Sequence, residues 1–168
     1  MAEFIQKHKL FSFYSTLMIV VVLIAIFAPW LAPGDAFSSN LSQALQAPSS
    51  QHWFGTDKLG RDVLSRIIYG TQLSLFMGVS IVVIMVSIGT IIGAVAGYFG
   101  GKIEMVLMRL ADIMLSFPGV VLAIAIAGIL GGSIVNTIIA LSVVGWAKYA
   151  RLVRSMTLKV RGEEYVTA

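Results

Sequence analysis

Cysteine is absent from this sequence, and charged residues are scarce. The absence of Cys excludes a disulfide framework, thiolate metal sites and cysteine nucleophiles. Charged residues make up 12% and hydrophobic residues 58% of the 168 residues, whereas a soluble domain has about 25% charged residues. A water-soluble core cannot account for this balance, and several apolar runs reach the length of about 20 residues that crosses a bilayer. The composition predicts an all-α, multi-pass bundle of transmembrane helices.

The sequence also lacks the residue sets of a catalytic or metal-binding centre. Its two histidines lie far apart: His8 belongs to the basic N-terminal flank, and His52 stands beside Trp53 in a loop, where we expect a structural role. No paired carboxylates and no Ser/His/Asp set occur in a plausible catalytic arrangement. We therefore predict that the chain is not an enzyme and itself binds neither a metal nor a cofactor.

Four apolar segments are long enough to cross a membrane as helices. They cover residues of about 10–31, 73–99, 106–130 and 134–153. The first follows a basic flank at 1–9, as in a signal peptide, but its apolar run is long and Pro29 gives a poor cleavage context, so we favour an uncleaved helix. Short loops join the last three segments, which we expect to be antiparallel neighbours.

The distribution of Lys and Arg predicts the orientation of the helices. Of the 12 basic residues, three lie in the loop between the first two spans, and nine lie at the opposite ends of the spans. The three are Lys58, Arg61 and Arg66, and the nine are Lys7, Lys9, Lys102, Arg109, Lys148, Arg151, Arg154, Lys159 and Arg161. Because basic residues accumulate on the cytoplasmic side, we expect the N-terminus and the tail in the cytoplasm. The charge of +4 is then a topology signal rather than a nucleic-acid footprint.

The predicted outer loop, residues 32–72, changes character half-way along. Its first part is rich in Pro, Ser, Gln and Asn, and residues 55–62 then precede apolar residues at helical spacing. We interpret residues of about 60–70 as an amphipathic helix at the outer membrane surface. Residues 55–62 would open this helix, with Thr56 or Asp57 as its N-cap.

Gly55 and Gly60 have the spacing of the glycines in a phosphate-binding loop. However, Arg61 and Asp62 replace the Lys and the hydroxyl residue of that loop, and no strand precedes them. A carboxylate at this position would repel a phosphate. If ATP drives this protein, we expect a different chain to bind it.

The second predicted span carries three glycines four residues apart, Gly89, Gly93 and Gly97. Small residues at this spacing let two helix backbones approach closely in a membrane. The row predicts tight helix packing, although a flexible gating helix would show the same pattern.

Arg109 and Asp112 are charged residues near the cytoplasmic start of the third predicted span. Charges at membrane depth are usually paired or face a cavity. Further along, Pro118 removes a backbone hydrogen bond and predicts a kink. We interpret the two charges as a salt bridge that anchors the helix end. The alternative is a bent helix that lines a translocation path, with the pair at its inner mouth.

Lys148, Arg151 and Arg154 recur every third residue beyond Trp146 and share one helix face. This pattern is typical of long basic side chains that reach the headgroup region. A contact with another subunit is the alternative.

Three stretches of the sequence carry specific motifs. Residues 52–66 read H-W-F-G-T-D-K-L-G-R-D-V-L-S-R, residues 108–118 contain M-R-L-A-D and S-F-P, and residues 146–168 run from W-A-K-Y-A-R-L-V-R to E-E-Y-V-T-A. In this combination they resemble the permease subunits of bacterial ABC importers for dipeptides, oligopeptides and nickel. The H-W pair of the first stretch and residues 146–151 look slightly more like the nickel branch.

The resemblance implies that residues 73–168 belong to a permease core and that residues 159–168 begin a cytoplasmic "EAA" loop. In that family the loop forms a short coupling helix in a groove of the ATP-hydrolysing subunit. The residues that would begin this helix are Glu163, Glu164, Tyr165 and Ala168. The matching residues of the outer-loop motif are Gly55, Thr56, Asp57, Gly60, Arg61 and Asp62. The family continues to about six spans, so we expect this chain to be truncated at its C-terminus.

The resemblance also implies partners and a location in the bacterial cytoplasmic membrane. The partners would be a second permease subunit, identical or different, two ATPase subunits that bind ATP, an extracytoplasmic binding protein and membrane lipid, but no nucleic acid. The cargo would be nickel, as a chelate, or di- and oligopeptides, and the sequence does not identify the residues that bind it. A membrane scaffold without transport and a passive channel are the alternatives.

Overall fold

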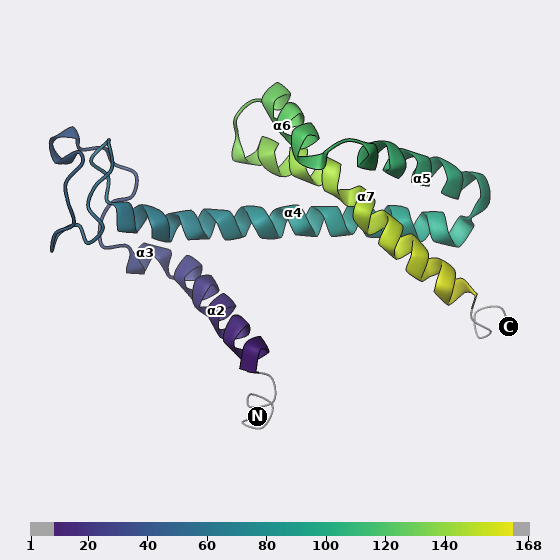
Figure 1. The fold of residues 1–168 in the computed structure, drawn as a ribbon, viewed down its shortest axis with the longest axis horizontal. Helices are drawn as coiled ribbons and strands as arrows, with labels where there is room; N and C mark the ends of the chain where they lie inside the picture. The colour runs from purple at the N-terminus through teal and green to yellow at the C-terminus, as the bar shows by residue number, and fades with distance from the viewer. Residues whose placement is uncertain (1–8, 163–168) are drawn as a thin grey trace. The chain divides into compact units, whose positions relative to one another are not determined.

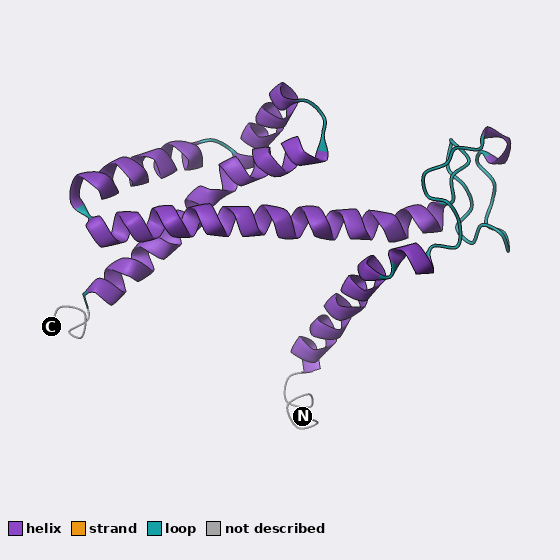
Figure 2. Cartoon of the chain, turned by 180° about the vertical axis from the view of Figure 1, so that it is seen from behind, coloured by secondary structure: helices purple, strands orange, loops and turns teal. Residues whose placement is uncertain are grey.

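The computed structural model describes residues 9–162, and no strand forms in this part of the chain (Figure 2). In chain order (Figure 1), the elements are α2 Lys9–Ile26, α3 Ala28–Leu31, the 3-10 helix η1 Leu41–Gln43, α4 Val63–Phe99, α5 Gly101–Ser116, α6 Gly119–Leu130 and α7 Ile134–Arg161. By length and composition, α2 and α4 can each cross a membrane, and α5 with α6 can together form a third span. The prediction of an all-α membrane protein is confirmed.

The contacts divide the chain into two compact units, residues 1–76 and 77–168, and α4 runs through the boundary between them. The first unit contains α2, α3, η1 and the start of α4. Here the predicted span 10–31 is two helices, which are separated at Phe27. Pro29 explains the interruption, because it has no N–H to donate to the helix ladder and its ring crowds the carbonyl four residues before it.

α4 is one continuous helix where the sequence predicts a surface helix at about 60–70 and a separate span at 73–99. Its 37 residues give a length of about 55 Å at 1.5 Å per residue. No Pro occurs within it, and the chain has no helix-ending turn between the two predicted elements. The two predicted elements are therefore a single helix, longer than the hydrocarbon layer of about 30 Å.

The third predicted span, residues 106–130, is two helices that meet at a sharp bend. α5 and α6 are bent by 90° at the break between them. Phe117 is extended there, with φ −92° and ψ 147°, which is the conformation that a residue before proline favours. Pro118 follows as the N-cap residue of α6. The proline therefore interrupts the helix completely instead of only kinking it.

The core of the second unit lies where α7 packs against α5 and α4. Its buried residues are Ala111, Trp146, Ala147 and Ala150, and partly buried apolar side chains of α4 and α5 surround them. Because three of these four residues are alanines, the helices can approach closely. α7 also packs along α6, and it continues to Arg161, beyond the end predicted for the last span. Many large apolar side chains of these helices are exposed, as is usual for surfaces that face lipid.

Candidate functional site

Asp62 organises the outer-loop motif from the position just before α4. The residue is buried, and its Oδ2 accepts a hydrogen bond of 2.7 Å from the backbone N–H of Ser65. Nδ1 of His52 lies 3.0 Å from Oδ1. Burial by itself would raise the pKa of Asp62, but the hydrogen bonds from Ser65 and His52 outweigh it and lower the pKa. Asp62 therefore caps α4, and the prediction of Thr56 or Asp57 as the N-cap is wrong.

Thr56 and Asp57 instead hold the outer loop closed. The Thr56 hydroxyl donates to the carbonyl of Gln43 and accepts a hydrogen bond of 2.8 Å from the backbone N–H of Gln46. Asp57 forms ion pairs with Arg61, at 2.8 Å, and with Arg66 in the first turn of α4. The hydrogen bond from Arg61 holds the pKa of Asp57 far below its ordinary value. The side chains of Thr56 and Asp57 are thus engaged within the first unit.

The two glycines of the motif have backbone angles that other residues rarely adopt. Gly55 has φ +70° and Gly60 has φ +73°. A Cβ atom on Gly60 would also collide with the carbonyl oxygen of Asn40. Residues 55–62 therefore form a turn that precedes α4. The prediction that they are the start of the helix is wrong.

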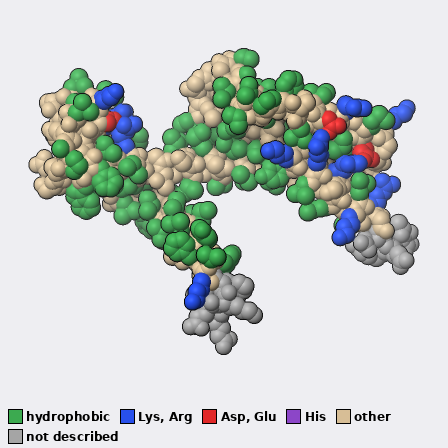
Figure 3. Space-filling view, viewed as in Figure 1, with side chains coloured by type: hydrophobic (Ala, Val, Ile, Leu, Met, Phe, Trp, Pro, Cys, Tyr) green, Lys and Arg blue, Asp and Glu red, His purple; other side chains and the backbone are tan. Residues whose placement is uncertain are grey.

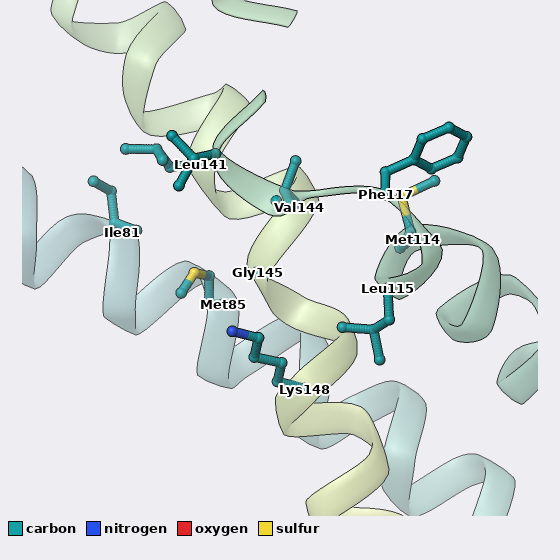
Figure 4. A pocket seen from close by; sticks show the side chains of 11 residues that line it. Ile81, Met85, Met114, Leu115, Phe117, Leu141, Val144, Gly145 and Lys148 are labelled. Atoms are coloured by element: carbon teal, nitrogen blue, oxygen red, sulfur yellow. The ribbon is translucent and has the colours of Figure 1, made fainter. Parts of the chain in front are cut away.

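A pocket of about 470 Å³ lies beside the break between α5 and α6. Met85 of α4, Leu115 and Phe117 at the end of α5, and Val144 of α7 contribute to its wall, and Lys148 lies at its edge (Figure 4). The wall is mostly apolar, and Lys148 has no ion pair with any described residue. A cation in such surroundings is unfavourable unless water or an anionic group reaches it.

A second, more polar groove of about 540 Å³ lies between α5 and α7. In it, Asp112 pairs with Arg151, and Glu104 pairs with Arg154, whose Nε donates to Oε1 at 2.6 Å. Arg109 lines the groove but forms no ion pair within residues 9–162. The predicted pair of Arg109 with Asp112 thus does not form, because the carboxylate binds an arginine of α7 instead.

Removing the charges of Glu104 and Arg154 tests the bond between α5 and α7. We expect Glu104→Gln or Arg154→Gln alone to lower the free energy of unfolding by about 2 kcal/mol, because each leaves a partly buried charge without its partner. The double variant should lose less free energy of unfolding than the two single variants lose together, and the difference is a coupling energy of about 1 to 2 kcal/mol. Denaturant unfolding in detergent micelles, followed by circular dichroism, measures all four proteins. Additive costs would show that the pair contributes nothing.

Two protein-family models match the chain. Residues 89–168 match the family described as "Binding-protein-dependent transport system inner membrane component", and residues 5–48 match the "N-terminal TM domain of oligopeptide transport permease C". Together the two matches support a permease of this transport family. The resemblance to ABC importers for dipeptides, oligopeptides and nickel is thereby confirmed.

Individual members of the permease family are similar to nearly the whole chain. A dipeptide transport system permease protein of Alkalihalophilus pseudofirmus is 44% identical over 164 residues, which cover 98% of this chain and 54% of the relative. A nickel transport system permease protein of Escherichia coli is 38% identical over 149 residues, covering 89% and 54%. A glutathione transport system permease protein of Escherichia coli is 43% identical over 153 residues, covering 89% and 50%. The chain spans about half the length of the curated relatives it matches.

The glycine row lies within the region that matches the permease family, and it faces α7. A Cβ atom on Gly89 would lie 2.5 Å from the Cβ of Tyr149, and one on Gly97 would lie 2.7 Å from the Cβ of Thr157. A Cβ on Gly93 would collide with a backbone carbonyl oxygen of α7. The two helix backbones therefore touch over about two turns, as small residues at this spacing allow.

The residues that resemble the start of the permease coupling helix lie outside the described residues. They are Glu163, Glu164, Tyr165 and Ala168. α7 is the helix that leads toward them, and its last turn carries the basic residues Lys159 and Arg161.

Glu104 belongs to the groove between α5 and α7 but is not among the residues that the sequence predicts for the site. It lies in the first turn of α5, and its partner Arg154 is 50 positions away, so no local pattern links the two. A signal was nevertheless present. Glu104 is one of 8 acidic residues in the chain, and a charge within a mostly apolar stretch predicts a partner or a cavity.

Proposed function

We propose that this chain is a transmembrane subunit of an ATP-driven importer that carries nickel, as a chelate, or short peptides into the cell. The observation that carries the proposal is the match of residues 89–168 to the inner membrane component of binding-protein-dependent transport systems. This region contains the break between α5 and α6. Non-helical backbone at membrane depth is tolerated where it is buried in protein or lines a cavity, which supports a path for cargo beside the break.

The order of contacts between α4 and α7 supports an orientation of these two helices in the membrane. Gly89 of α4 lies against Tyr149 of α7, and Gly97 lies against Thr157. Residue numbers rise together along both helices, so the helices run in the same direction and their C-terminal ends lie on one side. The basic residues at the end of α7 favour the cytoplasm for that side. We therefore infer that the tail after α7 faces the ATPase subunits, which bind ATP.

The names of the relatives support a cargo class but not one substrate. Relatives named for dipeptide, nickel and glutathione transport are 44%, 38% and 43% identical to the chain. These values do not separate the cargoes, so the proposal covers small peptides and a nickel chelate. An external binding protein would take part in the importer, as the description of the family indicates, and we propose that a second permease subunit completes it.

Reconstitution in liposomes tests the proposal. The vesicles contain this chain, a second permease subunit and two ATPase subunits, and the binding protein is added on the outer side. We expect uptake of labelled nickel or a labelled dipeptide only when both ATP and this chain are present. Flux without ATP would instead indicate a passive channel. ATP hydrolysis that is indifferent to this chain, without uptake, would indicate a scaffold, and either result overturns the proposal.

A further inference from the structure

The groove between α5 and α7 carries more positive than negative charge. Its charged lining consists of Glu104, Arg109, Asp112, Arg151 and Arg154. Each carboxylate is held by one arginine of α7, whereas Arg109 has no ion pair with a described residue. Because a guanidinium has five N–H donors, the two arginines of α7 also keep donors that their carboxylates do not use. The groove can therefore bind an anion.

The groove lies near the depth of the lipid headgroups. α4 ends at Tyr98 and Phe99, whose ring centroids are 5.2 Å apart and whose side chains are 67% and 60% exposed. Exposed aromatic rings at the end of a span are typical of the membrane–water interface. Arg154 belongs to the same level, because its carbonyl oxygen would lie 3.1 Å from a Cβ atom on Gly97, two residues before the end of α4.

An exposed apolar face of α5 accompanies the groove. Val106, Leu110 and Ile113 are 67%, 45% and 48% exposed and follow one another at helical spacing. Met105 lines the groove itself. Basic side chains gather at this end of the second unit, next to hydrophobic ones (Figure 3). An anion bound here has apolar surface beside it, which suits acyl chains and offers nothing to a free inorganic ion.

We propose that this groove binds the phosphate of an anionic phospholipid with one net negative charge, such as phosphatidylglycerol. Arg109 is the principal contact, because it is the arginine without a carboxylate, and the planar guanidinium matches phosphate geometry. Basic pockets between transmembrane helices are known to suit lipid phosphates. Glu104 and Asp112 neutralise two of the three arginines, so one net positive charge faces the lipid. The site does not depend on the proposed cargo or on ATP.

Lipid binding by the purified full chain tests this site. The chain is equilibrated in detergent with phosphatidylglycerol or phosphatidylcholine, and native mass spectrometry measures the bound lipid. We expect a preference for phosphatidylglycerol and about a fivefold weaker binding of it by Arg109→Gln, the effect of one basic residue near the membrane surface. Arg109→Lys should retain most of the affinity. Lys159→Gln removes the same charge from α7 outside the groove and should change the affinity less than about twofold.

Three outcomes would overturn the proposal. Equal losses in Arg109→Gln and Lys159→Gln, with circular dichroism showing intact helices, would mean general surface attraction. Full displacement of the lipid by inorganic phosphate would mean a site for the free anion. Loss of the lipid when the second permease and ATPase subunits are added would mean that an acidic protein surface pairs with Arg109. Retention in the complex, with the loss confined to Arg109→Gln, supports the site.

Discussion

Replacing Gly93 by Val should separate α4 from α7 and produce one of the largest losses of stability in this chain. Gly93 is the middle glycine of the row, and a Cβ atom there would collide with the carbonyl oxygen of Ala150. It would also lie 2.9 Å from the Cβ of Val153 and 3.0 Å from the backbone nitrogen of Arg154. Two of these three atoms are backbone, so no rotamer change relieves the contact. We expect a cost of about 3 kcal/mol, the upper end for overpacking in a core.

Gly78→Val is the matched control for this change. Gly78 lies on the same helix, but a Cβ atom there would have no neighbour within 4 Å, so the same substitution adds a side chain to open space. Denaturant unfolding of both variants in the same detergent compares the costs. Gly78→Val should stay within about 0.5 kcal/mol of the parent, as surface changes usually do. Similar costs for the two variants would mean that α4 and α7 do not pack as described, because helix propensity favours Val over Gly at both positions and cannot explain a loss.

The glycine row also shows what the sequence can and cannot predict about packing. The four-residue spacing of Gly89, Gly93 and Gly97 predicts a close helix contact, because the pattern is local and small residues at this spacing let two backbones approach closely in a membrane. The identity of the partner is not local. α7 contributes Tyr149 and Thr157, about sixty positions away in the chain, and nothing in the glycine spacing selects them.

The ion pairs in the groove between α5 and α7 also join residues that are distant in the sequence, and here the local pattern predicts the wrong partner. Sequence spacing suggests a pair between Arg109 and Asp112, since side chains three residues apart on a helix are neighbours. The structure places Asp112 against Arg151, which is 39 positions away. An ion pair between two helices ties them together, whereas a pair within one helix would not. Counting the charged residues could have indicated that arginines outnumber carboxylates. Only the arrangement of the helices decides which arginine is left without a partner.

The sequence predicts the position of the helix interruption at Pro118, but it does not predict how large the bend is. Proline predicts a disturbance, because it removes one hydrogen bond and crowds the preceding turn. Whether the helix bends or stops depends on the residue before it. Phe117 is extended, and α6 then begins in a new direction, 90° from α5. The hydropathy of residues 106–130 is continuous across the break, so hydropathy alone predicts one span.

Asp62→Ala should open the outer loop of the first unit, and it is the second change for which we expect a large effect. The carboxylate of Asp62 caps α4 through the N–H of Ser65 and holds His52 at 3.0 Å. The hydroxyl of Ser65 in turn accepts a hydrogen bond of 3.0 Å from the N–H of Gly34. Removing the carboxylate deletes a helix cap, worth about 1 kcal/mol, and leaves buried donors unsatisfied at about 1 to 3 kcal/mol. We expect a total of about 2 to 3 kcal/mol.

Asp35→Ala is the matched control for Asp62→Ala, because Asp35 also accepts two backbone hydrogen bonds, from Phe37 and Ser38, but is exposed to water. Water can replace its carboxylate, so we expect a loss below about 1 kcal/mol. Hydrogen exchange of residues 34–65 compares the local opening of the two variants without requiring the chain to unfold. Protection should fall by about 30-fold or more in Asp62→Ala, which is 2 kcal/mol at room temperature, and by less than about fivefold in Asp35→Ala. If the two variants lose equal protection, burial of Asp62 does not stabilise the loop, and the role of the outer-loop motif is then better explained by a contact outside this chain.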